Sequence, residues 1–339
     1  MKEAMFYSTK DDGKQNVQCH LCPHSCVIKP GKRGLCRVRE NRDGVLWSLV
    51  YGKIVSENVD PIEKKPIFHL LPGSFSFSIA TVGCNFHCRH CQNYEISQYP
   101  QLHNDIIPGA TRTPEQIVAI AKQYGCQSIS YTYVEPTIFF EFAFETAVLA
   151  REAGLKNIFV SNGYISSEAT RKIAPYLDAN NIDLKAFSTK FYRDICGAKL
   201  APILETIKLM KELGVWVEIT TLIIPGLNDS DQELRDIADF IKGIDPEMPW
   251  HISRFHPTYK MIDISPTPVS TLHKARQIGL DVGLVHVYEG NIPGSGEENT
   301  CCGGCGKILI ERTGYHIALN TLINGNCPAC QTPLAGIFA

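Results

Sequence analysis

The sequence lacks an excess of charge of either sign, a long apolar run and an apolar N-terminal segment. Lys and Arg number 33 and Asp and Glu 35, a net charge of −2 at pH 7, so no bulk field draws the chain to nucleic acid or anionic membranes. The longest charge-free run, between His69 and Arg89, is broken by proline and glycine and is no membrane span. Because Met1–Glu3 does not begin a signal peptide, we predict a cytoplasmic protein without membrane or nucleic-acid partners.

The sequence also lacks low-complexity segments and extremes of composition. Hydrophobic residues make up 44% and charged residues 20% of the 339 residues, which excludes disordered, collagen-like and coiled-coil proteins. A globular chain of this length has roughly two domains, or one barrel with appendages.

Cysteine is the abundant chemistry-bearing residue, with fourteen in the chain. In a reducing compartment, clustered cysteines bind metals more often than they form disulfides. Cys126 and Cys196 stand alone, and we expect them to be core residues. The others fall into three groups: Cys19, Cys22, Cys26 and Cys36; Cys84, Cys88 and Cys91; and Cys301, Cys302, Cys305, Cys327 and Cys330.

Between the terminal cysteine groups, strand-like apolar runs alternate with helix-periodic segments. Their spacing of about 25 to 35 residues is typical of βα units around a parallel sheet. Six strands are predicted, with a seventh at Val285–Tyr288. The six are Phe75–Val82, Ser128–Tyr133, Asn157–Ser161, Asn180–Leu184, Val215–Ile224 and Trp250–Phe255.

Start and stop signals support the intervening helices. Thr113, Pro114 and Gln116 form a capping-box pattern, and Ser230 with Glu233 forms a second. Glycine is favoured where a helix ends in a left-handed residue. The glycines at such positions are Gly125, Gly154 and Gly214.

The central motif, Gly83–Cys91, contains C-x3-C-x2-C directly after the first predicted barrel strand. An iron–sulfur cube normally takes four cysteine ligands, so a compact triplet would leave one iron open to another ligand. The alternative is a zinc knuckle that uses His87 or His90 as its fourth ligand.

Polar side chains follow every one of the six strands, and in a parallel barrel the active site lies at the carboxyl ends of the strands. Singly, these residues could be structural: Glu135 could cap a helix and Asp183 could pair with Lys185. A lone His256 would more often be a satisfied partner than a catalyst. Their gathering at one rim indicates a site instead. They are Cys84, Glu135, Ser161–Gly163, Asp183–Lys185, Pro225–Asp229 and Arg254–Pro257.

With the triplet Cys84, Cys88 and Cys91 at this position, the sequence resembles the radical S-adenosylmethionine (radical SAM) superfamily. The resemblance implies a [4Fe-4S] cluster held by these three cysteines, with the methionyl amino and carboxylate groups of S-adenosylmethionine on the fourth iron. It also implies reductive cleavage of the sulfonium to a 5′-deoxyadenosyl radical, which abstracts hydrogen from a substrate. The implied fold is α/β, a partial (β/α)6 barrel of TIM-like type.

Within the superfamily, the sequence is most similar to the pyruvate formate-lyase activating enzyme group. That group has a Gly-Gly-Glu-Pro element whose backbone meets the methionyl amino group; here Tyr133 and Val134 stand in place of the glycines. Val160 stands where the group has an acidic residue that helps to form a cation site. The resemblance implies roles in binding S-adenosylmethionine for Glu135, Ser161, Asn162, Asp183, Lys185 and His256.

Long motifs also resemble a narrower family, the radical enzyme of the AmmeMemoRadiSam system. That family is named for two companion proteins often encoded beside it, and the resemblance makes these companions candidate substrates. The motifs are Cys22–Cys26, Asp60–Pro66, Cys91–Asn93, Tyr131–Thr137 and Trp250–Pro257.

The C-terminal cysteines form two C-x2-C knuckles separated by 21 residues, as in a zinc ribbon or a rubredoxin-like module. Four thiolates suit zinc and iron equally, so the site would hold structural zinc or an electron-relaying iron. Cys301 should be spare. The predicted ligands are Cys302, Cys305, Cys327 and Cys330.

The N-terminal cysteines have the spacing C-x2-C-x3-C-x9-C. His20 or His24 could substitute for one of them. Thiolate quartets serve both structural zinc and auxiliary iron–sulfur clusters, and both remain open here. The predicted ligands are Cys19, Cys22, Cys26 and Cys36.

We therefore predict an N-terminal Cys-rich extension (1–74), a radical SAM partial barrel (75–294) and a zinc-ribbon or rubredoxin-like lobe (295–339), with Gly294–Gly296 as a linker. The predicted activity is that of an oxidoreductase of the activating-enzyme type. It would receive one electron from a ferredoxin or flavodoxin and abstract hydrogen from a peptide or protein. The alternatives are a radical enzyme acting on a small molecule and a multi-zinc scaffold without radical chemistry.

Overall fold

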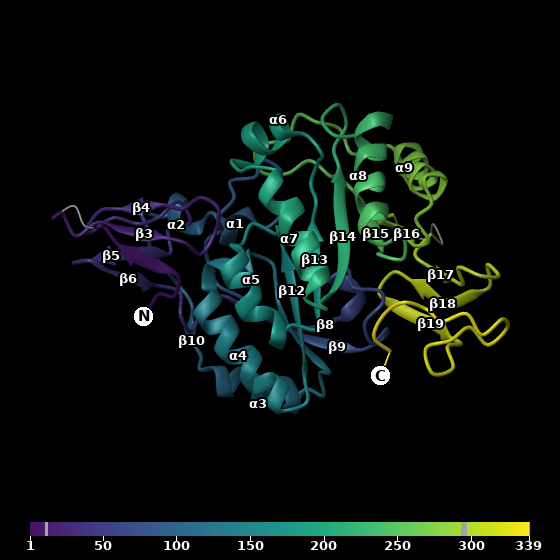
Figure 1. Ribbon diagram of the computed structural model, residues 1–339, viewed down its shortest axis with the longest axis horizontal. Coiled ribbons are helices and arrows are strands. Elements are labelled where there is room, and N and C mark those ends of the chain that lie inside the picture. Colours follow the sequence, from purple (N-terminus) through teal and green to yellow (C-terminus); the bar gives the residue numbers. More distant parts are fainter. Residues whose placement is uncertain (11–12, 293–296, 339) are drawn as a thin grey trace.

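A computed structural model describes residues 1–10, 13–292 and 297–338. In these residues the central feature is an eight-stranded sheet in the order β16-β15-β14-β13-β12-β11-β9-β8 (Figure 1). Neighbours from β9 to β16 are parallel, and β8 pairs antiparallel with β9. The strands are β8 (Ser56–Pro61), β9 (Phe75–Ala80), β11 (Ser128–Tyr131), β12 (Lys156–Ser161), β13 (Ala179–Asp183), β14 (Trp216–Ile223), β15 (Trp250–Arg254) and β16 (Val287–Gly290).

The α/β fold predicted as a partial barrel of parallel strands is confirmed, and its central sheet is open and mostly parallel. All six predicted strands and the seventh are present, with shifts of a few residues at their ends. The second strand ends at Tyr131 rather than Tyr133, because Tyr133 has a φ of 63° and leaves the extended conformation. The strand β8, which was not predicted, adds an edge to the sheet from within residues 1–74.

Helices connect the parallel strands and cover the outer face of the sheet (Figure 1). Four further short elements are not α-helical: η1, η2 and η3 are 3₁₀ helices, and η4 is a single π-helical turn. The helices are α1 (Tyr94–Ser97), α2 (Tyr99–Leu102), α3 (Pro114–Gln123), α4 (Phe140–Glu152), α5 (Ser167–Ile173), α6 (Thr189–Phe191), α7 (Ala201–Glu212), α8 (Asp231–Ile244) and α9 (Val269–Val282); the others are η1 (Ile62–Lys64), η2 (Pro136–Phe139), η3 (Ala174–Tyr176) and η4 (Tyr192–Cys196).

Local sequence signals place the helix ends. Thr113 and Gln116 form the complete capping box at the start of α3. At the start of α8 the Ser230 side chain accepts from the backbone N–H of Glu233. The Glu233 side chain accepts from the backbone N–H of Phe187 instead, so the second predicted capping box is only half formed. Helices α3, α4 and α7 are each followed by the predicted glycine with a positive φ, at Gly125 (66°), Gly154 (77°) and Gly214 (80°).

Two cysteine-rich lobes lie at opposite ends of the long axis (Figure 1). The C-terminal lobe docks through buried Arg312, whose guanidinium donates to the carbonyl of Phe68 at 2.9 Å. The predicted linker Gly294–Gly296 lies outside the described residues. The strands of the lobes are β1 (Lys2–Glu3), β2 (Tyr7–Thr9), β3 (Val17–Cys19), β4 (Val27–Ile28), β5 (Arg39–Arg42) and β6 (Val45–Ser48), with β7 (Lys53–Ile54) paired to β10 (Ala110–Thr111), and β17 (Thr300–Cys301), β18 (Ile308–Thr313) and β19 (His316–Asn320).

One large hydrophobic core fills the space between the sheet and its helices and continues into the N-terminal lobe. A smaller core, which includes Leu309 and Ile310, lies in the C-terminal lobe. In the described parts of the chain, no helix combines the length and the apolar character that crossing a membrane requires.

Candidate active site and metal centres

The cysteine triplet occupies the loop between β9 and α1. The backbone N–H of Phe86 points at the Cys84 Sγ at 3.4 Å, and the Ser97 hydroxyl lies 3.3 Å from the Cys91 Sγ. Two backbone hydrogen bonds join the loop to η4, including one from the N–H of His87 to the carbonyl of Cys196 at 2.9 Å. The loop is thus held by the fold on both sides.

The pKa of each thiol in the triplet is raised, which favours the neutral thiol when no metal is bound. Burial raises the pKa of Cys84 and of Cys91. A hydrogen bond with the Cys196 thiol, together with burial, raises the pKa of Cys88 well above its usual value. Because thiolates are the metal ligands, a bound cation would have to provide the charge that deprotonates them.

The triplet opens into a cavity of about 850 Å³ at the carboxyl ends of the strands. This places the predicted site residues in one space, although they come from five strands and their following loops. The loop Pro225–Asp229 is an exception: it does not line the cavity, and Asn228 instead donates to the carbonyls of Lys185 and Leu222. The predicted residues that line the cavity are Cys84, Cys88, Cys91, Glu135, Ser161, Asn162, Asp183, Lys185 and His256.

Glu135 joins the ends of β11 and β12. Its buried carboxylate accepts from the hydroxyls of Thr137 (2.6 Å) and Ser161 (2.9 Å) and from the backbone N–H groups of Asn162 (2.7 Å) and Thr137 (3.1 Å). Burial nevertheless raises the pKa of Glu135. The side chain therefore acts as a clamp on the backbone that faces the cavity, and it also caps η2.

Asn162 connects this rim to the cysteine loop. Its Nδ2 donates to the Oδ1 of Asn85 at 2.8 Å, and Asn85 follows Cys84 directly. The turn after Asn162 contains Gly163, with a φ of 71°, where a Cβ would lie 2.9 Å from Ile182. A side chain at position 163 would therefore displace the rim.

Asp183 and Lys185 pair at 2.7 Å at the end of β13. Although burial opposes the charge of Lys185, the nearby Asp183 carboxylate holds the pKa of Lys185 well above the usual value. The predicted ion pair is present, and it supplies a cation beside the triplet. His256 lies exposed at the mouth of the cavity, so it can reach only a ligand that extends to the rim.

Tyr133 occupies the position of a motif glycine and adopts a glycine-like conformation, with a φ of 63°. Its carbonyl accepts from the Asn93 side chain at 2.8 Å, and its hydroxyl donates to Asp60. The Lys65 ammonium lies 4.9 Å from the ring centroid. These contacts hold the strained backbone in the shape for which glycine is usually required.

Sequence reasoning missed two buried ionic contacts beside the cavity, made by Lys65 and His251, which line it. Asp60 accepts from Lys65 at 2.5 Å, and burial lowers the pKa of Lys65 to about 8. Glu218 accepts from the His251 Nε2 at 2.6 Å, and although burial opposes it, this contact helps to hold the pKa of Glu218 at about 2. The available signal for Glu218 was an acidic residue inside the mostly apolar strand β14.

The donor set of the triplet fits a cluster better than a single metal. Sulfurs around one tetrahedral zinc lie roughly 3.8 Å apart, given Zn–S bonds of about 2.3 Å. Within the described chain, no three cysteine, histidine or acidic ligand atoms in this cavity come within 4.8 Å of one another, so the zinc knuckle with His87 or His90 is not formed. The Nδ1 of His90 is buried without a hydrogen-bond partner among the described residues, which leaves it available to a bound group.

The thiols of the C-terminal quartet, unlike those of the triplet, are close enough to share one ion. Its four sulfur atoms lie within 4.8 Å of one another, and Cys302 to Cys330 and Cys305 to Cys327 measure 3.5 and 3.7 Å. Hydrogen bonds with Thr332 help to lower the pKa of Cys330 to about 6. The predicted four ligands therefore converge on the space of one tetrahedral ion, and Cys301 is not among them.

Known proteins resemble this chain at several levels. The sequence model of the Radical SAM superfamily matches residues 78–241. An uncharacterized protein of Methanocaldococcus jannaschii is 50% identical over 313 residues, which cover 92% of each chain. A putative glycyl-radical enzyme activating enzyme of the same organism is 25% identical over 211 residues, 61% of this chain and 78% of that one. A crystallised domain of a pyruvate-formate lyase-activating enzyme from Bacteroides vulgatus aligns with a TM-score of 0.43 and 19% identity, over 48% of this chain and 99% of that chain.

Proposed function

This chain belongs to the radical SAM superfamily, and from that membership we propose that it cleaves S-adenosylmethionine reductively and abstracts hydrogen from a peptide or protein. The observation that carries the proposal is the cavity itself. Three thiols without a fourth cavity cysteine share it with carboxylate, amide and ammonium groups at the strand ends. This arrangement suits a cluster with one open iron beside a zwitterionic ligand.

Cys84, Cys88 and Cys91 would hold the [4Fe-4S] cluster, which when bound supplies the electron that cleaves the sulfonium to a 5′-deoxyadenosyl radical. The chain's own residues position the ligand. Lys185 and Asp183 would bind charged and hydroxyl groups beside the triplet, and Glu135 holds backbone that would face the methionyl amino group. His256 would approach the nucleoside from the rim.

The macromolecular substrate is supported by relatives whose names include activating enzymes, such as the pyruvate formate-lyase-activating enzyme of Clostridium pasteurianum, 26% identical over 168 residues. The open sheet leaves the cavity accessible at its mouth, where a polypeptide loop could enter. The companion proteins of the AmmeMemoRadiSam system are the first partners to test. A ferredoxin or flavodoxin in the cytoplasm would supply the electron.

A small-molecule substrate is the second candidate, and one observation favours it. Beyond the triplet, the cavity continues to Lys65, His251 and Glu289, which are buried polar residues that could orient a compact polar ligand. A volume of about 850 Å³ is within the range of small-molecule sites. A multi-zinc scaffold would need three single-ion sites, whereas only the C-terminal quartet of the described residues has that geometry.

Deuterium labelling tests the substrate class. Each companion protein would be prepared perdeuterated and incubated anaerobically with the reconstituted enzyme, S-adenosylmethionine and dithionite. Abstraction from the protein predicts deuterium in the 5′-deoxyadenosine and a mass change in the companion. Unlabelled 5′-deoxyadenosine with every companion would argue against these proteins and favour a small molecule. The Cys84, Cys88 and Cys91 to Ala triple variant is the control and should form none.

The metals of the terminal lobes are part of the proposal. The C-terminal quartet would hold zinc or iron, and both ions fit its dimensions. Metal analysis of the purified protein distinguishes the two.

A further inference from the structure

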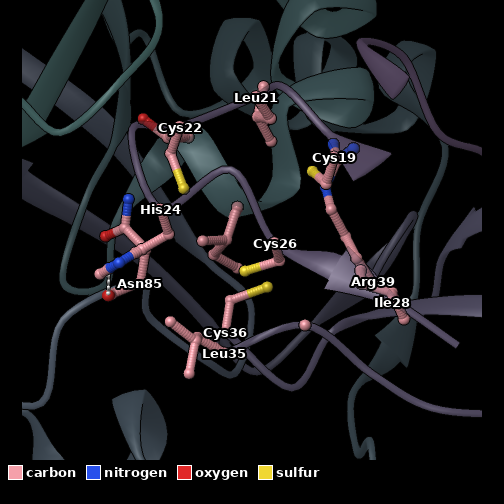
Figure 2. Close-up of a pocket in the computed structure, with 13 residues that line it drawn as sticks. Cys19, Leu21, Cys22, His24, Cys26, Ile28, Leu35, Cys36, Arg39 and Asn85 are labelled. Carbon is pink, nitrogen blue, oxygen red and sulfur yellow. Dashed lines mark hydrogen bonds between the residues drawn. The ribbon is translucent and has the colours of Figure 1, made fainter. Parts of the chain in front are cut away.

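The four N-terminal cysteines surround one small pocket, although they come from three separate turns and strands. Figure 2 shows Cys19, Cys22, Cys26 and Cys36 lining this pocket together. None of the four thiols is engaged in a disulfide. Burial raises the pKa of Cys36 to about 11 and also raises the pKa of Cys26 and Cys22.

These thiols do not converge as the C-terminal thiols do. Among the described residues, the C-terminal quartet alone brings three or more ligand atoms within 4.8 Å of one another. Every set of three N-terminal thiols therefore contains a wider pair than one tetrahedral ion allows, since such sulfurs lie roughly 3.8 Å apart. The same chain thus provides an internal comparison: one quartet has the dimensions of a single ion, and the thiols of the other are spaced more widely.

A buried arginine lines the pocket with an unused donor. Arg39 is 1% exposed, and its Nη2 pairs with Glu141 at 2.5 Å. Its Nε has no hydrogen-bond partner among the described residues. A buried N–H group without an acceptor is costly, and hydrogen bonds to cluster sulfurs are among the contacts that tune iron–sulfur centres. A residue that lines the pocket therefore has a buried N–H group still available to an acceptor such as a cluster sulfide.

The pocket adjoins the active-site loop directly. The Nε2 of His24 lies 2.8 Å from the carbonyl oxygen of Asn85, the residue after Cys84, and Asn85 itself lines the pocket. On the other side, a Cβ at Gly83 would lie 3.0 Å from the carbonyl oxygen of Cys36. Residues on both sides of Cys84 thus lie against the segments that carry the N-terminal cysteines.

We propose that Cys19, Cys22, Cys26 and Cys36 hold a second, polynuclear iron–sulfur cluster that delivers electrons to the centre at Cys84, Cys88 and Cys91. A low-potential one-electron carrier of the ferredoxin or flavodoxin type would be oxidised and the N-terminal cluster reduced by one electron. The N-terminal cluster would then be reoxidised as the active-site cluster is reduced, so the cluster returns to its starting state and no atom is transferred. The delivery step rests on the proposed function; the presence of the cluster does not.

Acid-labile sulfide tests the cluster, because neither zinc nor a mononuclear iron site contains sulfide. In the Cys84, Cys88 and Cys91 to Ala triple variant, we expect about half of the wild-type sulfide to remain, as two similar clusters would give. Cys301→Ala is the matched control and should retain all of it. A folded triple variant without sulfide, or one with zinc in the N-terminal quartet, would overturn the proposal.

The unmutated protein provides a second measurement that does not depend on the folding of a variant. After reduction with dithionite, two paramagnetic signals are expected in electron paramagnetic resonance, and S-adenosylmethionine should shift only one. A single signal that S-adenosylmethionine shifts completely would contradict the second cluster. Two signals without formation of 5′-deoxyadenosine would contradict the proposed function and leave the second cluster intact.

Electron delivery is tested with the variant in which Cys19, Cys22, Cys26 and Cys36 are all Ser. Reduction of the remaining cluster by a ferredoxin or flavodoxin should slow by an order of magnitude or more. Reduction by dithionite, a small reductant that can reach the open cavity, should change much less. Equal slowing with both reductants, or none with either, would contradict a relay role.

Discussion

The Cys196 thiol lies close enough to the Cys88 thiol to help raise the pKa of Cys88, although 107 residues separate them and only Cys88 lines the cavity. Cys196 belongs to the π-helical turn η4, whose carbonyls also hold the cysteine loop. Cys196 could therefore be a fourth ligand of the active-site cluster. Three-cysteine and four-cysteine ligand sets predict different behaviour for the Cys88→Ala and Cys196→Ala variants.

If three cysteines hold the cluster, Cys88→Ala should lose the sulfide of this site and Cys196→Ala should keep it. A cluster with three cysteine ligands has one iron open to S-adenosylmethionine. The Cys196→Ala variant should therefore still form 5′-deoxyadenosine. Sulfide analysis and product analysis of both variants after anaerobic reconstitution provide the readout. Equal loss of the cluster in the two variants would mean that Cys196 is a fourth ligand, which would close the site.

Asn162→Ala should destabilise the chain by about 1–3 kcal/mol, because it leaves the buried Oδ1 of Asn85 without its donor. The midpoint of urea unfolding should therefore fall. The same variant should bind S-adenosylmethionine more weakly, since the rim and the cysteine loop lose their connection. Gln123→Ala, at an exposed position, is the control and should stay within about 0.5 kcal/mol of wild type. An Asn162→Ala protein as stable as this control would argue against the connection.

The lowered pKa of buried His69 predicts that the protein loses stability in mild acid. Burial lowers its pKa to about 4, whereas an unfolded histidine titrates near about 6.5. Between these values the unfolded state binds the extra proton, so the free energy of unfolding should fall as the pH drops from about 6.5 to about 4, by up to about 3 kcal/mol. Unfolding titrations of wild type and His69→Asn measure this. The variant should show a shallower dependence, and exposed His103→Gln should match wild type.

The C-terminal quartet predicts a strict difference between neighbouring cysteines. Cys330→Ala should release the bound ion and unfold its lobe, which has only a small core of its own. Cys301→Ala should change neither, because Cys301 lies outside the quartet. Metal content and limited proteolysis of residues 297–338 report the two effects. Release of the ion from both variants would show that the ligand set has been misassigned.

Much of the fold and part of the site follow from the sequence because their signals are local. The capping box at Thr113 and the glycines after the helices set the ends of helices. The spacing of the cysteines from Cys302 to Cys330 identifies the ligands of the C-terminal site. The gathering of Glu135 and Asp183 at one rim follows because parallel strands end on the same side.

What could not be predicted depends on contacts between distant segments. Asp60 and Tyr133 are 73 residues apart and meet because β8 adds an antiparallel edge to the sheet, which no local pattern indicated. The pairing of Glu218 with His251 likewise depends on the register of β14 against β15. The conformation of Tyr133 was hidden for the same reason, because its partners come from elsewhere in the chain.

The most direct test of the central claim is quantification of 5′-deoxyadenosine and methionine after anaerobic reconstitution with iron and sulfide, reduction with dithionite and addition of S-adenosylmethionine. The account predicts that wild type forms the two products in equal amounts and that the Cys84, Cys88 and Cys91 to Ala variant forms neither. A fully reconstituted, reduced wild-type protein that leaves S-adenosylmethionine intact would contradict it.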